Sequence, residues 1–481
     1  TVTDDPERVA LAVAAYAAGD APPSIASTLV PITSTTARSP TRPTSWISAQ
    51  MGHFFRAHLH ARSLSTDTCH MAVPTLPRPR PEPAEDRVRC LVVMGTRPET
   101  IKMLPVVQAL RQSSLLQPFV VNTGQHADMV LPILEAAGIT PDVDLQIGRA
   151  NNTINGLVRD CVDAFDQLLT DLRGGAERRN RPRLFGAAEH PGSAYPALTL
   201  VHGDTTSAMS AALASIGCKL PVIHVEAGLR TRDILSPFPE ELNRQLISRM
   251  AAFHLAPTPA NQANLIREGV DTERVFVTGN TGIDAFHWAA GLHADWPDPR
   301  LRALDDPAIP VVVVTAHRRE NLGEPIRRIA EAVKQIAQVR PDALVVWPVH
   351  PNPKVREVVY GVLDDMSNVL LTEPIDYIPF ARLLERATLA ISDSGGVQEE
   401  APSVGTPVLV ARTESERPEG VDSGALILVG SNTDLIRDTT LSLLDDDRAR
   451  LAMTANINPF GDGHAATRVR SALEHLVFNT S

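Results

Sequence analysis

The sequence predicts an α/β protein that contains two doubly wound domains, each built on a parallel sheet. From Arg89 onward, short runs rich in β-branched residues alternate with amphipathic segments, which is the pattern of βαβ units. The strand-like runs form two series that meet near Val277–Gly282. The chain of 481 residues is long enough for two or three domains of about 100–200 residues each.

The first series of expected strands precedes the changeover. It comprises Cys90–Gly95, Phe119–Thr123, Leu198–Asp204, Val222–Ala227 and His254–Thr258. A strong helical pattern covers Ile154–Leu172, between the second and third of these runs. In open parallel sheets, ligands bind beyond the carboxyl ends of the strands, so reactive side chains are expected at those ends.

The second series has the same character, with a helical pattern over Pro325–Val339. Its expected strands are Val311–Ala316, Ala343–His350, Val369–Glu373, Leu389–Asp393, Val408–Ala411 and Leu426–Val429.

These patterns divide the chain into a first domain over residues 89–279 and a second over 280–460, with a C-terminal segment over 461–481. Residues 1–88 are rich in Pro, Ser and Thr, and we expect a disordered extension there because too little apolar surface is available for a core. Gly174–Ala197 is far longer than the usual connection of about 2–6 residues. It is expected to be a surface insertion, with a lid or a partner site as the alternative.

Composition excludes several classes of function. The chain has 45 Lys and Arg against 56 Asp and Glu, a net charge of −11, which argues against a nucleic-acid-binding protein. No apolar run reaches the roughly 18 residues of a membrane-spanning helix. The cysteines lack CxxC spacing, so we expect no metal site, no disulfide framework and a reducing cytoplasm; they are Cys69, Cys90, Cys161 and Cys218.

The first strand leads into the segment GTRPETIK. Gly95 permits a tight turn and Pro98 suits the first turn of a helix. Arg97 and Lys102 would then lie near a helix N-terminus, where anions bind; a solvated helix start with incidental charges is the alternative. The chain has no GxGxxG or GxxxxGK[ST] motif, so neither dinucleotide binding nor a P-loop is supported.

Three carboxylates follow successive strands of the first series. Asp204 ends one strand, Glu226 ends the next, and Glu240 lies in the loop that follows. Asp204 could simply cap a helix. If the three converge, they cannot all ionise freely, and they could supply the acid and the base that proton transfer at carbon requires.

The second series supplies complementary groups. His317, Arg318 and Arg319 follow its first strand, and the arginines could equally form surface ion pairs. The segment Ser394–Gly396 opens a helix whose N–H groups could approach a phosphate. Glu400 lies one turn further, where it could accept hydrogen bonds from two ribose hydroxyls. An ordinary Gly-rich turn is the alternative.

Taken together, these motifs resemble the non-hydrolysing UDP-N-acetylglucosamine (UDP-GlcNAc) 2-epimerases, from about Arg89 to Leu476. The matching stretches occur in the order of the family: MGTRPETIKMLP, NTGQH, LVHGDTTS, HVEAGLRT, SPFPEELNR, FVTGNTGID, HRRENLGEP, WPVHPNP, ISDSGGVQEEAPSVGTPVLV, ERPEGVDSG and NPFGDGHAA.

The resemblance implies two Rossmann-like domains that face a central cleft, as in the GT-B glycosyltransferases. It also implies that a last helix near Ala465–Val477 crosses back to the first domain. The implied reaction converts UDP-GlcNAc to UDP-N-acetylmannosamine (UDP-ManNAc) through a bound 2-acetamidoglucal, with no cofactor and no metal.

The resemblance also assigns roles to residues. Asp204, Glu226 and Glu240 match the acid–base carboxylates, and Lys102, Arg97 and His317 match groups that neutralise the diphosphate. The substrate-binding positions are completed by Ser394, Gly395, Gly396, Glu400, Arg230 and Asn321.

One loop departs from the family. Many bacterial members bind a second UDP-GlcNAc as an activator, through a loop that reads roughly GQHRxM. Here the loop is GQHADM: Gln125 and His126 are retained, Ala127 replaces the arginine, and Asp128 adds a carboxylate. We therefore expect a weak or absent allosteric response.

Two alternatives stay open. A hydrolysing relative would release free ManNAc and UDP, and a glycosyltransferase of similar shape would use a UDP-sugar without proton exchange at C2. In each case the expected partner is a UDP-sugar, with no nucleic acid and no membrane. A homodimer is usual in the family and is expected here.

Overall fold

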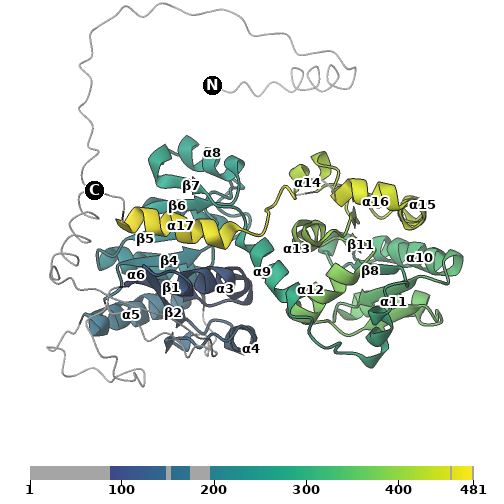
Figure 1. Cartoon of the computed structure of the whole chain (residues 1–481), viewed down its shortest axis with the longest axis horizontal. Coiled ribbons are helices and arrows are strands. Elements are labelled where there is room, and N and C mark those ends of the chain that lie inside the picture. The colour runs from purple at the N-terminus through teal and green to yellow at the C-terminus, as the bar shows by residue number, and fades with distance from the viewer. Residues whose placement is uncertain (1–86, 148–152, 174–194, 416, 455–457, 479–481) are drawn as a thin grey trace, which may run out of the picture. The chain divides into compact units, whose positions relative to one another are not determined.

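The computed structural model describes residues 87–147, 153–173, 195–415, 417–454 and 458–478. Within these residues the chain forms two parallel sheets flanked by helices, which confirms the predicted fold class (Figure 1). Nearly all of the expected N-terminal extension, and most of the expected insertion at Gly174–Ala197, lie outside the described residues.

The first sheet has the strand order β3-β2-β1-β4-β5-β6-β7. Its strands are β1 (Val88–Met94), β2 (Leu116–Asn122), β3 (Val143–Asp144), β4 (Leu198–His202), β5 (Val222–Val225), β6 (Phe253–Ala256) and β7 (Val275–Val277). The helices that accompany them are α3 (Arg97–Arg111), α4 (Ala127–Ala136), α5 (Ile154–Leu172), α6 (Thr206–Gly217), α7 (Glu240–Met250) and α8 (Pro259–Arg267). The next helix, α9 (Thr281–Gly291), contacts α3, and its buried Ile283, Phe286 and Ala289 belong to a core cluster of the second sheet.

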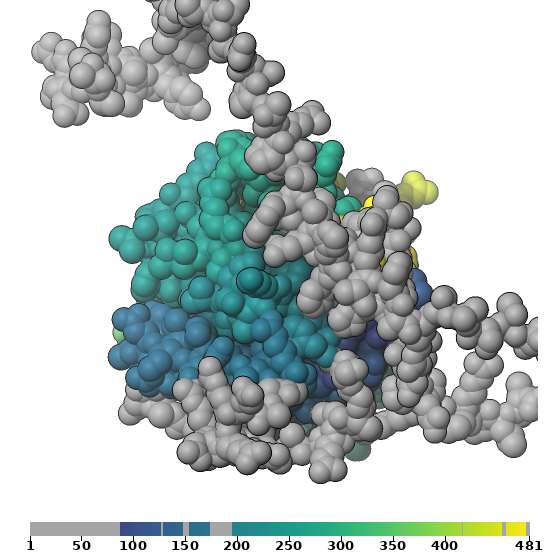
Figure 2. Space-filling model, turned by 90° about the vertical axis from the view of Figure 1, so that its left-hand side faces the viewer, coloured from purple at the N-terminus to yellow at the C-terminus, as the bar shows by residue number. Residues whose placement is uncertain are grey.

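Both faces of this sheet are covered, which is why its central strands read as nearly continuous apolar runs. Phe165 of α5 and Ile247 of α7 pack on one face, and Leu104 and Leu110 of α3 pack on the other. Seen from the left-hand side of Figure 1, the surface of the segments around α5 (blue) lies next to that of the later segments of the domain (teal; Figure 2).

The second sheet has the strand order β10-β9-β8-β11-β12-β13. Its strands are β8 (Val311–Thr315), β9 (Leu344–Pro348), β10 (Val369–Thr372), β11 (Leu389–Ser392), β12 (Val408–Val410) and β13 (Leu426–Leu428). Its helices are α10 (Glu324–Val339), α11 (Pro353–Leu363), α12 (Tyr377–Arg386), α13 (Gly395–Glu400), α14 (Pro418–Asp422), α15 (Thr433–Asp445) and α16 (Asp447–Thr454). Buried Trp347 and Ile336 belong to the core on one face, and Leu384 to the core on the other.

The last helix, α17 (Ala465–Phe478), packs against α3 of the first domain. Leu473 and Leu476 of α17 share a buried cluster with Leu104 and Leu110. Its first backbone N–H groups, those of Ala465 and Ala466, donate to the carboxylate of Asp284 on α9, at 3.1 and 2.8 Å.

Both strand orders reverse at a defined place. In the first sheet the switch lies between β1 and β4, and in the second between β8 and β11. Helix α3, which follows β1, carries Lys102, and the loop after β4 carries Asp204; the loops after β8 and β11 carry His317 and Ser394. Ligands bind preferentially at such switch points, so the predicted reactive groups occupy the expected positions in the fold.

Neither a membrane-spanning helix nor a cluster of metal ligands is found among the described residues. No helix among them is both long and apolar enough to cross a membrane. They also contain no cluster of three or more His, Cys, Asp or Glu side chains that could bind a metal ion.

Two buried histidines lie side by side in the first sheet. His224 of β5 pairs in register with His254 of β6, and their ring centroids are 6.4 Å apart. His224 shares a hydrogen bond of 2.7 Å with the carbonyl oxygen of Gly203, whereas neither ring nitrogen of His254 has a partner among the described residues. Burial lowers the pKa of His224 to about 4 and that of His254 to about 3.

We expect this pair to make the protein acid-sensitive. Each histidine is neutral when folded and takes up a proton on unfolding below its unfolded pKa of roughly 6.5, so stability falls as the pH falls. Two protons correspond to about 2.7 kcal/mol of unfolding free energy per pH unit between about pH 6 and 4. Denaturant titrations across this range measure how the unfolding free energy changes with pH, that is, its slope against pH. In His254→Leu, the part of this slope that comes from the histidine pair should fall to about half.

The exposed His464 provides a control, since His464→Leu should leave that slope unchanged. Equal slopes in wild type and His254→Leu would show that the buried pair does not govern acid stability.

Candidate active site

The first domain contains a cavity of about 490 Å³ at the carboxyl ends of its central strands. Its walls come from the segments after β1, β2, β4 and β5 and from the starts of α5 and α7. The lining residues are Thr96, Pro98, Glu99, Lys102, Gln125, His126, Ile154, Leu157, His202, Gly203, Asp204, Thr205, Thr206, Glu226, Pro239 and Glu240. The cavity therefore contains the three predicted carboxylates together with Lys102.

The buried carboxylate of Glu99 fixes the loop after β1. One oxygen accepts from the backbone N–H groups of Gly95 and Thr96, at 3.1 and 2.8 Å. The other accepts from the hydroxyl of Thr205, so Glu99 also ties this loop to the loop after β4. Gly95 has no room for a side chain, since a Cβ there would lie 1.9 Å from the Thr123 hydroxyl oxygen.

Glu226 is held in an unusual backbone conformation by its surroundings. Its φ of 61° lies in the left-handed region, which non-glycine residues adopt at a cost of about 1–3 kcal/mol. Its carboxylate forms an ion pair with Lys102 and lies 3.4 Å from Nε2 of His202. Burial favours the neutral acid, but Lys102 and His202 outweigh it and hold the pKa of Glu226 well below its usual range.

Asp204 has a different partner. Arg244 of α7 donates to Oδ2 of Asp204 from Nε at 2.8 Å, and its NH2 atom lies 2.6 Å from the same oxygen. A further donor on Arg244 binds Glu241, which is fully buried. Asn243 donates to the backbone carbonyl of Asp204 at 2.9 Å. The start of α7 thus orients Asp204, while Glu240 begins the same helix and lines the cavity.

The two residues of the predicted activator loop also line this cavity. Gln125 accepts a hydrogen bond of 2.6 Å from the hydroxyl of Ser207, and His126 is exposed.

Two predicted substrate contacts have other partners. The side chain of Arg230 is only 1% exposed and forms hydrogen bonds of 2.7 and 2.9 Å to Glu268. Asn321 is 4% exposed and donates to Asp393 and to the carbonyl of Ala411. Both therefore stabilise loops, and neither lines the cavity.

In the second domain, Ser394 precedes α13 and Gly395 and Gly396 open it, as predicted. Glu400 is half-buried near the hydroxyl of Tyr377, and burial together with the neighbouring Glu399 raises its pKa to about 8.

Two contacts join segments that follow strands of the first sheet to a helix and a helix N-cap of the second domain. Asn280 donates to Glu399 at 3.0 Å, and Arg97 lies 3.9 Å from Asp376. Arg97 does not line the cavity.

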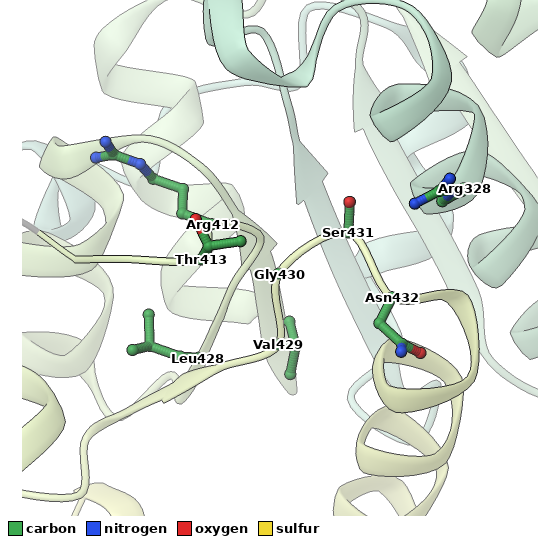
Figure 3. A pocket seen from close by; sticks show the side chains of 8 residues that line it. All are labelled: Arg328, Arg412, Thr413, Leu428, Val429, Gly430, Ser431 and Asn432. Carbon is green, nitrogen blue, oxygen red and sulfur yellow. The ribbon is translucent and has the colours of Figure 1, made fainter. Parts of the chain in front are cut away.

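A second hollow, of about 380 Å³, lies beside β13 and the start of α15. Figure 3 shows Arg328 and Arg412 on opposite sides of it, with the guanidinium of Arg412 directed away from Ser431. Arg412 is bound by Glu320. These arginines do not converge on one point, so the hollow has no counterpart to the charged walls of the first cavity.

The comparisons with known proteins point to one family. The sequence profile of the family described as UDP-N-acetylglucosamine 2-epimerase matches residues 184–474. The UDP-N-acetylglucosamine 2-epimerase of Yersinia pestis is 42% identical over 393 residues, which cover 81% of this chain and 99% of the relative. That of Escherichia coli K12 is 39% identical over 393 residues, covering 81% and 99%.

A solved structure supports the same grouping. The crystal structure of the UDP-GlcNAc 2-epimerase from Neisseria meningitidis, bound to UDP-GlcNAc, has a TM-score of 0.65 and 36% identity. The match covers 80% of this chain and 100% of that chain.

Proposed function

The chain belongs to the UDP-N-acetylglucosamine 2-epimerase family, and from this premise we propose that it interconverts UDP-GlcNAc and UDP-ManNAc without releasing the free sugar. The observation that carries this proposal is the single cavity lined by Asp204, Glu226 and Glu240 beside Lys102. Inversion at C2 needs proton removal on one face of the sugar and proton delivery on the other, which two differently placed carboxyl groups can perform.

In the proposed reaction, a carboxylate removes the C2 proton and the C2–H electron pair forms the C1=C2 bond of 2-acetamidoglucal. The C1–O electron pair leaves with UDP. UDP then re-adds to C1 while a second carboxyl group protonates C2 from the opposite face. The proton and UDP are both returned, so the overall reaction requires no redox cofactor.

The electrostatics of the cavity suit this sequence. Glu226 is ionised, as a base must be, because Lys102 and His202 keep its pKa low. Lys102 can change its ion-pair partner from Glu226 to the diphosphate of the substrate. Arg97, His317 and the N-terminus of α13 are proposed as further phosphate contacts. Glu400 is proposed to bind the ribose hydroxyls.

Proton NMR of a reaction with UDP-GlcNAc in D₂O tests the proposal. Formation of UDP-ManNAc with deuterium at C2 is expected. Free ManNAc and UDP would indicate the hydrolysing reaction instead. The absence of both exchange and product without an added acceptor would favour sugar transfer.

We expect hyperbolic dependence of the initial rate on UDP-GlcNAc, because the activator loop lacks its arginine and carries Asp128. Steady-state rates of wild type and Ala127→Arg test this, since the variant restores the arginine and should introduce sigmoidal dependence. Sigmoidal kinetics in the wild type, or conversion of UDP-ManNAc only after UDP-GlcNAc is added, would contradict the prediction.

The homodimer and the cytoplasmic location stay predictions. Sedimentation equilibrium of the purified chain would determine its oligomeric state.

A further inference from the structure

Asp393 directly follows β11, and its carboxylate is fully buried. One of its two oxygens accepts three hydrogen bonds. Its Oδ2 accepts from the backbone N–H groups of His317 and Arg318, each at 2.8 Å, and from the side-chain amide of Asn321 at 2.9 Å. Three donors on one oxygen fix the carboxyl plane and pin the loop after β8 to the loop after β11.

The other oxygen, Oδ1, is aimed at an imidazole. It lies 3.4 Å from Nδ1 of His317 and has no hydrogen-bond partner among the described residues. A buried carboxylate oxygen without a partner is costly, so this contact is expected to shorten when His317 is protonated. Pinning the loop through Oδ2 does not by itself account for an Oδ1 that faces the ring.

The surroundings of His317 limit how it can carry a proton. His350 stacks on it, with ring centroids 5.3 Å apart and planes 5° apart. Nδ1 of His350 accepts from the backbone N–H of Asn352 at 3.2 Å, which favours the neutral ring protonated at Nε2. Burial, His350 and Arg318 all lower the pKa of His317, and Asp393 is the group that opposes them.

We propose that Asp393 is the positioning residue of His317: its Oδ1 keeps the proton of the neutral ring on Nδ1, orients the imidazole, and supports the imidazolium that forms. The imidazolium, protonated at both nitrogens, donates its Nε2 proton to an oxygen of the departing diphosphate and becomes the neutral ring with its remaining proton on Nδ1. The ring recovers the Nε2 proton when UDP re-adds to C1. This inference rests on the proposed function for its effect on turnover, but the tautomer of His317 can be read without any reaction.

Asp393→Asn separates the two roles of this carboxylate. The amide oxygen can replace Oδ2 and still accept from the three N–H donors, so the loop is retained. The amide nitrogen replaces Oδ1 and donates to Nδ1, which forces the proton of the neutral ring to Nε2. We expect a reversed tautomer, a lower His317 pKa and a fall in kcat on the order of 10²-fold, with a smaller change in KM.

Imidazole ¹⁵N NMR of the full chain measures the tautomer and pKa, with the His317 signals assigned by their loss in His317→Gln. In the His317→Gln background, Asp393→Asn should cause no further loss of kcat, because its effect passes through the missing ring. Asp284→Asn is the matched control: this buried carboxylate also accepts two backbone N–H groups, and its loss should leave the His317 signals unchanged.

An unchanged tautomer and pKa in Asp393→Asn, or losses in kcat that multiply in the double variant, would overturn the proposal. If the wild type showed no epimerisation, the proposed function would fail, while the NMR measurement would still decide the role of Asp393.

Discussion

Glu226→Gln is expected to lower kcat by roughly 10²–10⁴-fold, the range for loss of a general acid or base. The strained backbone at Glu226 and its ion pair with Lys102 hold this carboxylate at the cavity wall. Glutamine has nearly the same shape but can neither accept nor deliver the C2 proton. Steady-state rates and deuterium incorporation at C2 should therefore fall together, whichever epimer is supplied.

Glu385→Gln provides the matched control, because Glu385 is exposed on α12 and does not line the cavity. It should leave both rates unchanged. A correctly folded Glu226→Gln protein with nearly normal turnover would remove Glu226 from the mechanism and leave Asp204 and Glu240 as the candidate pair.

Lys102→Met should have an effect of similar size. Lys102 is proposed to stabilise the charge that develops on the diphosphate, and loss of one such group lowers the rate by about 10²–10³-fold. Breaking the ion pair with Glu226 also costs folding stability, so the variant is compared after its folding has been verified. In wild type, Lys102 helps to hold the pKa of Glu226 low despite burial. Without that charge, burial gains weight and the pKa of Glu226 must rise.

The pH dependence gives the sign of this change. Wild-type Glu226 stays ionised as the pH falls through the usual range for glutamate, so we expect the activity proposed for it as a base to persist there. In Lys102→Met the fraction of ionised Glu226 falls at a higher pH, and the acid limb of kcat/KM should move upward. Lys102→Arg retains the charge and should leave that limb near its wild-type position. An acid limb that does not move in Lys102→Met would contradict the assigned coupling.

The sequence predicts both sheets because their central strands are apolar runs of four or more residues. It misses β3, because a segment of two residues shows no periodicity, and it misses β7, although β12 and β13 are predicted with the same length of three residues. β7 lies directly before the changeover and reads as part of that loop. Residues that end long buried strands, such as Asp204 and Glu226, are therefore easier to locate than residues on short or irregular segments.

The partners of the reactive groups are harder to predict. Arg244 lies within a matching stretch, but only folding shows that the first turns of α7 bring it to Asp204. His202 and Glu99 have the same difficulty, since a buried His or Glu looks like any polar residue beside a strand. Conversely, the family resemblance implies that Arg230 contacts the substrate, whereas in the structure its guanidinium forms an ion pair with Glu268.

The return of α17 to α3 has a consequence for synthesis. The ribosome makes the chain from its N-terminus, so the sheet of the first domain can form long before α17 exists. Until α17 emerges, the apolar surface of α3 that receives Leu473 and Leu476 lacks these contacts. The first domain thus begins to form before the second, and it is completed only after the second has been made. A nascent chain that stalls before α17 would expose an apolar surface of the kind that chaperones bind.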